Sequence, residues 1–359
     1  EYSTLECVAR SGDEKVNQSD ADGLYDIYLN GLPLNLYGGS LGGQLKGLIE
    51  VRDGNNGENF SAKGTYVTTT SDKVTVKIDK TNPNHDFLTD MNKVTMNPSG
   101  TIVVGNVRLV YDSWTYDADN ETYTFNLKSG EDASSLSGKD AYVGVSIDYQ
   151  GIPYYMAQMN EWVRSFAQAM NKIEKSAQDT SGNLAEAMFT SGSEELKFDD
   201  YDYNTGYDSG SNTVSTLKNN YLQLTAGNFN INNDMLKDVN LFGTTVDITQ
   251  GQDAQDITLE LIKVRTDKSK MTYRGCSSEE FLQCLTSDVA LGASSANNFY
   301  SNFDKISKSI VAQRTSVSGV DNDEEALNLV KFQEAYNLSS KMIQVMTEIY
   351  DRLILQTGV

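Results

Sequence analysis

The end of the chain has the clearest hydrophobic pattern, with apolar residues three and four positions apart through residues 321–359. This spacing predicts a long helix with one apolar seam. The seam residues are Leu329, Phe332, Tyr336, Ile343, Met346, Tyr350 and Leu353. A second stripe beside the seam contains Ala335, Leu338, Met342, Val345 and Ile349. The apolar face is therefore wider than one coiled-coil partner covers, and we expect it to need at least two neighbouring helices.

A second long helix is predicted over residues 276–320. Ser277 and Glu280 have the spacing of a capping box, which marks a helix start. An unbroken apolar register follows as far as Val317, and its larger members include Leu285, Val289, Phe299, Phe303, Ile306 and Ile310. The register slips at the segment SVSGVDND, so we expect the helix to break there. Asn322 and Glu325 are expected to form a second capping box for the last helix.

Two further helices are predicted nearer the start of the chain. Residues 151–178 carry a seam with alternating steps of three and four, whose members include Tyr155, Met159, Trp162, Phe166 and Ile173. A shorter amphipathic stretch, SLGGQLKGLIEVRDG, predicts a helix that stops at Gly54.

The segments between these helices alternate with the period of two that is typical of strands. Residues 1–53 predict hairpins, with an Asn-Gly turn at 30–31, followed by the short helix. Residues 54–150 predict a β domain, whose clearest hairpin joins 107–116 to 122–127. Residues 179–275 predict a smaller α+β or β unit, in which NNYLQLTAGNFNIN is strand-like. The fold class predicted is α+β and multidomain, with long coiled-coil-type helices and β-rich outer domains.

The length of the chain limits the number of domains, and its charge limits the classes of partner. A chain of 359 residues is long enough for two or three domains. Its 50 acidic and 29 basic residues give a net charge of −21, so phosphate backbones and anionic membrane surfaces repel it. No apolar run reaches membrane-spanning length, and no basic start with an apolar stretch marks a signal peptide. We expect neither a nucleic acid nor a membrane as partner. The chain begins within a strand-like alternation, which we interpret as a truncated or processed product.

Candidate metal chemistry is weak. The three cysteines lack metal-ligand spacing and do not indicate a disulfide scaffold. The single histidine, His85, lies in the polar context NPNHDF, and we interpret it as a surface-loop residue. The acidic stretch 198–212 offers calcium-type oxygen ligands at Asp200, Asp202, Asn204 and Asp208. Its Gly206 is one position late for an EF-hand loop and Ser211 replaces the bidentate Glu, so a solvated acidic loop is the favoured interpretation.

Candidate catalytic and cofactor chemistry is equally weak. The glycine-rich segment YGGSLGGQLKG lacks the Gly-Lys-Ser/Thr of a phosphate-binding loop. With 50 carboxylates in the chain, no acidic pair indicates a glycosidase by itself. We therefore predict no enzyme, no catalytic residue, no metal and no cofactor.

The closing segment SGVDNDEEALNLVKFQEAYNLSSKMIQVMTEIYDRLILQTGV resembles the carboxyl end shared by bacterial flagellar rod, hook and filament proteins. It is most similar to the hook-associated protein 1 family, which forms the first junction layer between hook and filament. Three other segments resemble that family in the same order, at 39–54, 159–171 and 224–296. The resemblance covers roughly half of the chain as ordered motifs.

The resemblance implies an arrangement of domains. The helix of 321–359 would line the inner tube of the axial structure, and the helices of 151–178 and 276–320 would form a rod-like domain. Residues 54–150 would be an inserted domain, since the family has no segment there. The family's amino-terminal portion, which holds the pairing helix and the uncleaved export signal, is missing from this sequence.

The resemblance also implies a function. We expect a structural component of the bacterial flagellum that joins hook to filament through self-assembly, exported by the type III apparatus without a cleavable signal. Expected partners are copies of itself in a helical or ring layer, the hook protein, the neighbouring hook-associated or filament protein, and an export chaperone. The alternative is a secreted surface adhesin, or binding module, that uses the inserted β domain.

Overall fold

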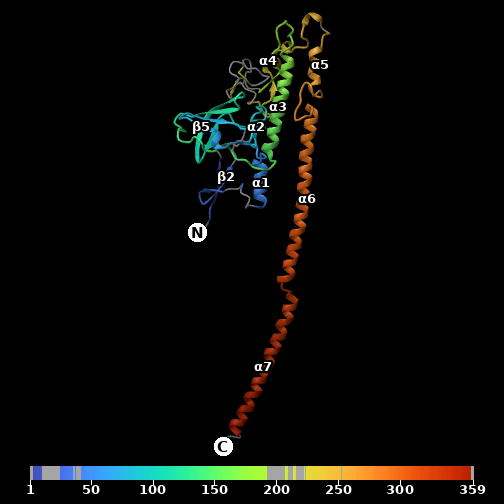
Figure 1. The fold of residues 1–359 in the computed structure, drawn as a ribbon. Helices are drawn as coiled ribbons and strands as arrows, with labels where there is room; N and C mark the ends of the chain where they lie inside the picture. The colour runs from blue at the N-terminus through green and yellow to red at the C-terminus, as the bar shows by residue number, and fades with distance from the viewer. Residues whose placement is uncertain are drawn as a thin grey trace. The chain divides into compact units, whose positions relative to one another are not determined.

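The structure is a computed structural model that describes residues 3–9, 25–34, 37, 42–191, 207–208, 213–215, 222, 224–251 and 253–356. The chain is a mixed α and β protein with antiparallel sheets and long helices at its carboxyl end (Figure 1). It divides into two compact units, Glu1–Leu285 and Thr286–Val359. The first unit holds every described strand, and the second is helical.

Among the described residues, the largest sheet has nine strands. Seven of them follow the order β4-β10-β7-β8-β9-β6-β5. Their bounds are β4 Phe60–Ala62, β5 Val67–Thr69, β6 Lys73–Lys77, β7 Gly100–Val104, β8 Val107–Asp117, β9 Thr122–Leu127 and β10 Ala141–Val143. The other two are β12 Tyr207–Asp208 and β13 Thr213–Ser215, which pairs with β8. Only the short turn η2, Gly64–Tyr66, joins β4 to β5, although these strands lie at opposite ends of the order. The sheet therefore curls, because so short a connection must bring its two ends together.

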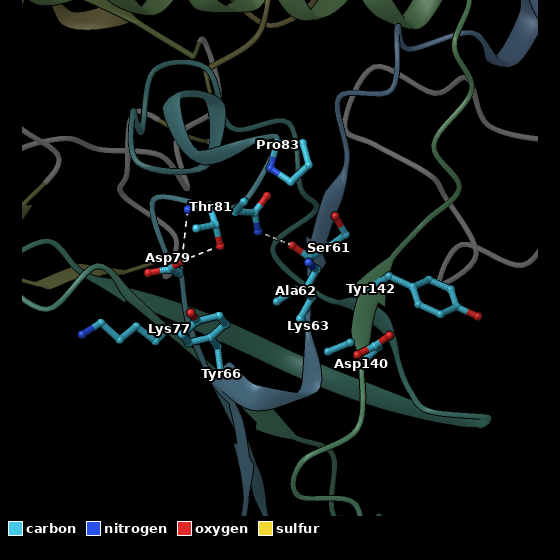
Figure 2. Close-up of a pocket in the computed structure, with 12 residues that line it drawn as sticks. Ser61, Ala62, Lys63, Tyr66, Lys77, Asp79, Thr81, Pro83, Asp140 and Tyr142 are labelled. Carbon is cyan, nitrogen blue, oxygen red and sulfur yellow. Dashed lines mark hydrogen bonds between the residues drawn. The ribbon is translucent and has the colours of Figure 1, made fainter.

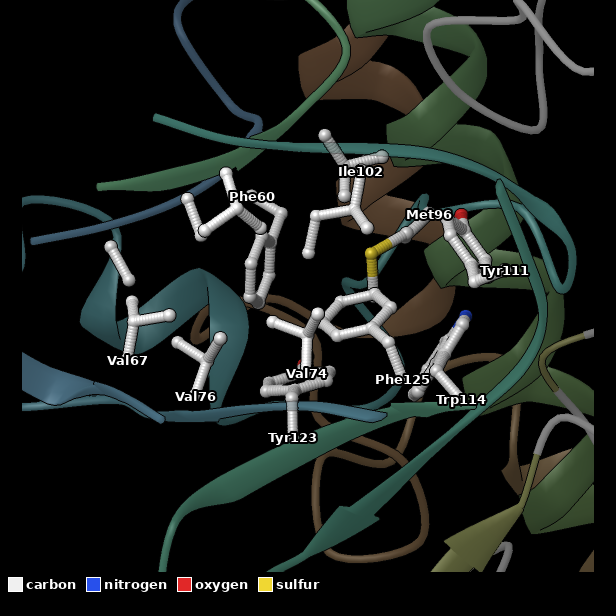
Figure 3. Packing of buried hydrophobic residues seen from close by; sticks show 14 of the residues in the cluster. Phe60, Val67, Val74, Val76, Met96, Ile102, Tyr111, Trp114, Tyr123 and Phe125 are labelled. Carbon is white, nitrogen blue, oxygen red and sulfur yellow. The ribbon is translucent and has the colours of Figure 1, made fainter. Parts of the chain in front are cut away.

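The hairpin of β8 and β9 carries the aromatic core of this sheet (Figure 3). The predicted hairpin is confirmed, with Trp114 opposite Phe125 and Tyr116 opposite Tyr123. Alternate side chains point inward, and their rings contact one another in edge-to-face and tilted pairs. Trp114 Nε1 donates to the Asn97 carbonyl at 2.9 Å, so this fully buried indole has a partner for its polar group.

The two ends of the segment 54–150 lie next to each other, where α1 ends and α3 begins. Helix α1, Gln44–Asp53, ends at Gly54, as predicted, and α3, Ile152–Glu174, begins after Gly151. The Gly151 N–H donates to the Gly54 carbonyl at 3.0 Å. A Cβ on Gly54 would lie 2.4 Å from the Glu50 carbonyl oxygen, and one on Gly151 would lie 2.6 Å from the same atom. Both positions therefore require glycine because the backbones approach so closely.

Smaller elements complete the first unit. β1 Leu5–Ala9, β2 Tyr25–Leu29 and β3 Leu32–Pro33 form an antiparallel sheet. The predicted Asn-Gly turn between β2 and β3 is confirmed, since Asn30 and Gly31 both have positive φ angles of 53° and 76°. The other short elements are α2 His85–Leu88, β11 Phe189–Thr190, β14 Asn230–Ile231, α4 Asn233–Lys237, η4 Val239–Leu241, η5 Ile248–Gln250 and α5 Asp256–Lys263.

Two sequence interpretations change here, and a third is not tested. His85 is not in an exposed loop: it begins α2, its side chain is only 19% exposed, and Nε2 lies 3.5 Å from Glu121 Oε1. The predicted strand-like segment NNYLQLTAGNFNIN is mostly turn and irregular structure where it is described, and its strand β14 spans only two residues. Most of the acidic stretch 198–212 lies outside the described residues.

The carboxyl end forms two helices, α6 Ser278–Ser318 and α7 Asn322–Gln356, so the predicted break is confirmed. The first capping box is confirmed too, because the Ser277 N–H donates to Glu280 Oε2 at 2.9 Å and the Glu280 N–H donates to Ser277 Oγ. The second prediction is wrong by one residue. Asp321, not Asn322, accepts the first N–H groups of α7, from Asp323 at 3.0 Å and Glu324 at 3.4 Å. A carboxylate at this position also interacts favourably with the helix dipole.

Candidate assembly surface on the carboxyl-terminal helices

Helix α7 presents its apolar seam to solvent. None of its residues is buried. The seven seam residues predicted from the sequence, Leu329, Phe332, Tyr336, Ile343, Met346, Tyr350 and Leu353, are between 54% and 76% exposed. The larger members of the second stripe, Leu338, Met342, Val345 and Ile349, are exposed to a similar degree. An apolar face of this size is rarely left in water, which makes it a candidate interaction surface.

Two polar residues within or beside this face already have hydrogen-bond partners. Ser339 lies in the seam, and its Oγ donates to the Ala335 carbonyl at 2.8 Å. Thr347 lies at the edge of the face, and its Oγ1 donates to the Ile343 carbonyl at 2.8 Å. A partner helix could cover both hydroxyls without leaving an unsatisfied donor, whose burial would otherwise cost stability.

The seam of α6 changes from buried to exposed along its length. Phe281 and Leu285 are buried in its first two turns. Beyond them, the predicted packing residues Val289, Phe299, Phe303, Ile306 and Ile310 are between 46% and 67% exposed. The structure therefore places these five residues on a second exposed apolar row.

The predicted seam of α3 lies in the core of the first unit. Tyr155, Met159, Trp162, Phe166 and Ile173 are partly buried. They pack against a cluster that contains Leu285 and Phe281 of α6, with Val264, Met271 and Tyr273. Trp162 Nε1 donates to the Ser278 carbonyl at 3.3 Å, which attaches the first turn of α6 to α3. Of the α6 residues predicted to pack in the rod-like domain, only Leu285 lies in this cluster.

Several exposed apolar residues were not part of the predicted seams. They are Leu291, Tyr300 and Val311 on α6, and Leu327, Val330, Ile354 and Leu355 on α7. They fall outside the regular steps of three and four, so their hydrophobicity alone was the available signal. Across the described ranges, no helix has both the length and the apolar character needed to span a membrane. The same residues contain no group of three His, Cys, Asp or Glu side chains that could hold a metal ion.

Comparison with known proteins gives two matches. Residues 311–356 match the family profile described as "Flagellar basal body rod FlgEFG protein C-terminal". The chain is also similar to "Flagellar hook-associated protein 1" of Bacillus subtilis (strain 168), with 29% identity over 100 residues, which is 28% of this chain and 20% of that protein. The matched region thus spans about a fifth of the relative's length. No solved structure matches.

These matches support a structural, flagellar hook-type protein. The profile match covers the end of α6 and all of α7, which is where the exposed apolar seam lies. Sequence similarity and exposed apolar surface therefore coincide on the same helices. Both matches are to flagellar proteins, which supports a flagellum-associated structural role.

Proposed function

We propose that this chain is a hook-associated protein 1 that joins hook to filament. In this proposal, α7 and the exposed part of α6 pack against copies of themselves in a ring or helical layer. The observation that carries the proposal is the exposed seam of α7, a helix in which no residue is buried. The neighbouring layers would be the hook protein and a further hook-associated or filament protein.

The size of the apolar face supports an assembly role over a merely exposed helix. Seven large seam side chains would contribute roughly 10–20 kcal/mol in total if fully buried, at about 1.5–3 kcal/mol each. A helix in water recovers none of this, and helix propensity alone gives it only marginal stability. Packing between copies supplies the missing burial. Because the second stripe widens the face, each α7 would contact at least two neighbours.

The adjacent ends of the segment 54–150 support an inserted β domain, and we propose that this domain faces outward from the assembly. Its two ends meet at the Gly54–Gly151 hydrogen bond, so the segment can be added or removed without displacing α1 from α3. We further propose that α3 and the start of α6 form the rod-like domain. In this arrangement, α7 would line the inner tube.

The test is a double substitution in the seam, Ile343→Asp with Met346→Asp, introduced into the chromosomal gene. Two carboxylates in a buried interface are strongly unfavourable, so we expect an exported and folded protein that fails to enter the hook–filament junction. Electron microscopy of flagella and a motility assay give the readout. The expected result is loss of filaments with hooks still present.

A matched control places two aspartates on the polar face of the same helix, as Asn337→Asp with Gln344→Asp. This variant adds the same charge and should assemble normally. Normal filaments from the seam variant would contradict the proposal. Loss of filaments in both variants would also contradict it, because the effect would then come from charge rather than from the apolar face.

A further inference from the structure

A cavity of about 330 Å³ lies where the curled sheet does not close (Figure 2). Strand β4 pairs with β10 on one side, and Ser61 lies opposite Tyr142. Within the described residues, the other edge of β4 has no strand partner. Instead, Asn82 Nδ2 donates to the Ser61 carbonyl at 2.7 Å. A side chain thus takes the place of a strand, and the space that a strand would fill is open.

Two carboxylates stand on opposite sides of β4 in this cavity (Figure 2). Asp140 Oδ1 accepts a hydrogen bond from the Gly64 N–H at 2.7 Å, and Oδ2 takes no part in that bond. Asp79 Oδ2 accepts the Thr81 hydroxyl at 2.5 Å and the Thr81 N–H at 3.0 Å. These bonds lower the pKa of Asp79, so it remains ionised at neutral pH. Both carboxylates are therefore fixed acceptors for hydroxyl donors.

Apolar and aromatic side chains form another part of the lining. Ala62 and Ala141 are buried at the cavity, and Tyr66, Pro83 and Tyr142 also line it. Hydrogen bonding to Asp79 raises the pKa of the Tyr66 hydroxyl and ties the ring to that wall. Tyr142 is 43% exposed, so its ring is accessible to a ligand.

The charges that line the cavity balance. Lys63 and Lys77 are matched by Asp79 and Asp140. A ligand with a large net charge gains nothing from such a lining. A neutral ligand with several hydroxyl donors and one apolar face fits every group present, because the carboxylates accept hydroxyls and tyrosine rings favour apolar contact.

We propose that this cavity binds one hexose-sized unit of a neutral saccharide. Its volume is at the small end for ligand pockets, which suits one sugar ring rather than a folded partner. The net charge of −21 disfavours an oligonucleotide or another polyanion as the ligand. This binding activity goes beyond the structural role proposed above and does not depend on it, because the cavity lies in the 54–150 segment.

The test is a titration of the full 359-residue chain with the methyl glycosides of glucose, galactose, mannose and N-acetylglucosamine. Saturation-transfer difference NMR would detect binding. At least one glycoside is expected to bind saturably in the millimolar range. Asp140→Asn and Tyr142→Ala are each expected to weaken that binding about tenfold, the effect of losing one hydrogen bond to a charged group or one ring contact.

The variants are chosen to preserve the fold. Asparagine at 140 keeps an acceptor for the Gly64 N–H, and Tyr142 is exposed. Matched controls are Asp86→Asn and Tyr149→Ala, which change an exposed aspartate and an exposed tyrosine outside the cavity. Thermal melts of all four variants verify folding.

Three results would overturn the inference: no saturable binding of any of the four glycosides, unchanged affinity in both cavity variants, or tighter binding of glucuronic acid than of the neutral sugars. The assembly experiment tests residues of α7, whereas the sugar titration tests residues of the sheet. Failure of one proposal therefore leaves the other intact.

Discussion

Arg164 is a buried cation on α3 that donates hydrogen bonds to two distant parts of the chain. Its side chain is fully buried. Nε donates to the Leu224 carbonyl at 3.0 Å, Nη2 to Leu222 at 2.9 Å, and Nη1 to Asn92 and Val94 at 3.2 and 2.7 Å. Burial lowers its pKa to about 10, which leaves it charged at neutral pH. One guanidinium therefore links the β domain, Leu222 and Leu224 to α3.

Arg164→Met is expected to destabilise the first unit by about 3–5 kcal/mol, because it removes the donor of three buried hydrogen bonds and one partly buried hydrogen bond to carbonyls. Arg164→Lys is expected to lose nearly as much, since a single ammonium cannot reproduce the planar fork. Urea denaturation followed by Trp fluorescence measures both. Arg314→Met, on the exposed part of α6, is the control. A loss below about 1 kcal/mol in both Arg164 variants would contradict this role.

Glu174 introduces a pH dependence. The residue is fully buried at the end of α3, and Oε1 accepts the Gly243 N–H at 2.7 Å. Burial raises its pKa to about 7, although the hydrogen bond from Gly243 opposes the shift. Between the unfolded pKa and the folded pKa, the folded state binds more protons than the unfolded state. Stability from this group is therefore greatest at low pH and is lost as pH rises toward 7.

Glu174→Gln removes that charge and keeps an acceptor for Gly243. At pH 8 we expect the variant to be more stable than the wild type by about 3 kcal/mol, with the difference shrinking as pH falls toward about 4.5. Thermal melts of both proteins at each pH across this range measure the stability difference. Because other groups titrate alike in both proteins, their effects cancel in this difference. A constant difference at all pH values would contradict the assignment.

Two glycines in the first unit, Gly47 in α1 and Gly151 just before α3, have different surroundings. A Cβ on Gly151 would lie under 3.0 Å from the Glu50 and Val51 carbonyl oxygens and from the Gly54 nitrogen. A Cβ on Gly47, in the middle of α1, would have nothing within 4 Å. The same substitution should therefore have opposite effects at the two sites.

Gly151→Ala is expected to destabilise the junction between α1 and α3, because three backbone atoms must move. Gly47→Ala is expected to stabilise α1 by up to about 1 kcal/mol, the difference in helix propensity between the two residues. Chemical denaturation measures the change in the free energy of unfolding for each variant. Equal effects of the same sign would show that the close approach at Gly151 is not restrictive.

The two units differ in how many hydrophobic side chains they bury. The first unit contains four hydrophobic clusters, whereas no residue of α7 is buried. Long helices without tertiary burial open readily, while the backbone of a packed sheet exchanges only when the domain unfolds.

Hydrogen exchange should reveal this difference. In dilute solution, amides of 286–356 are expected to exchange much faster than those of β8 and β9. Under conditions in which the protein assembles, the α7 amides should gain protection and the sheet should not change. Mass spectrometry of peptic fragments measures both states, with the Ile343→Asp, Met346→Asp variant as the unassembled reference. Strong protection of α7 in that variant would show that assembly is not what stabilises it.

Elements with local signals could be predicted from the sequence. The helix α3, the first capping box, the Asn-Gly turn and the β8–β9 hairpin depend on residues a few positions apart, and each is confirmed. Spacing also selected the seven seam residues of α7, which are exposed, and their role in assembly stays a prediction. The cap of α7 was misplaced by one residue because Asp321 and Asn322 are both good caps, and spacing does not choose between them.

What covers each apolar face depends instead on the tertiary structure. The seams of α3 and α6 have the same steps of three and four, yet Trp162 is packed and Phe299 is exposed. Periodicity shows that a face is apolar, but burial depends on segments far away in the chain. The bonds of Arg164 to carbonyls about 60–70 residues away and the cavity beside β4 arise in the same way. Only folding brings those groups together, because no local pattern encodes contacts at such separations.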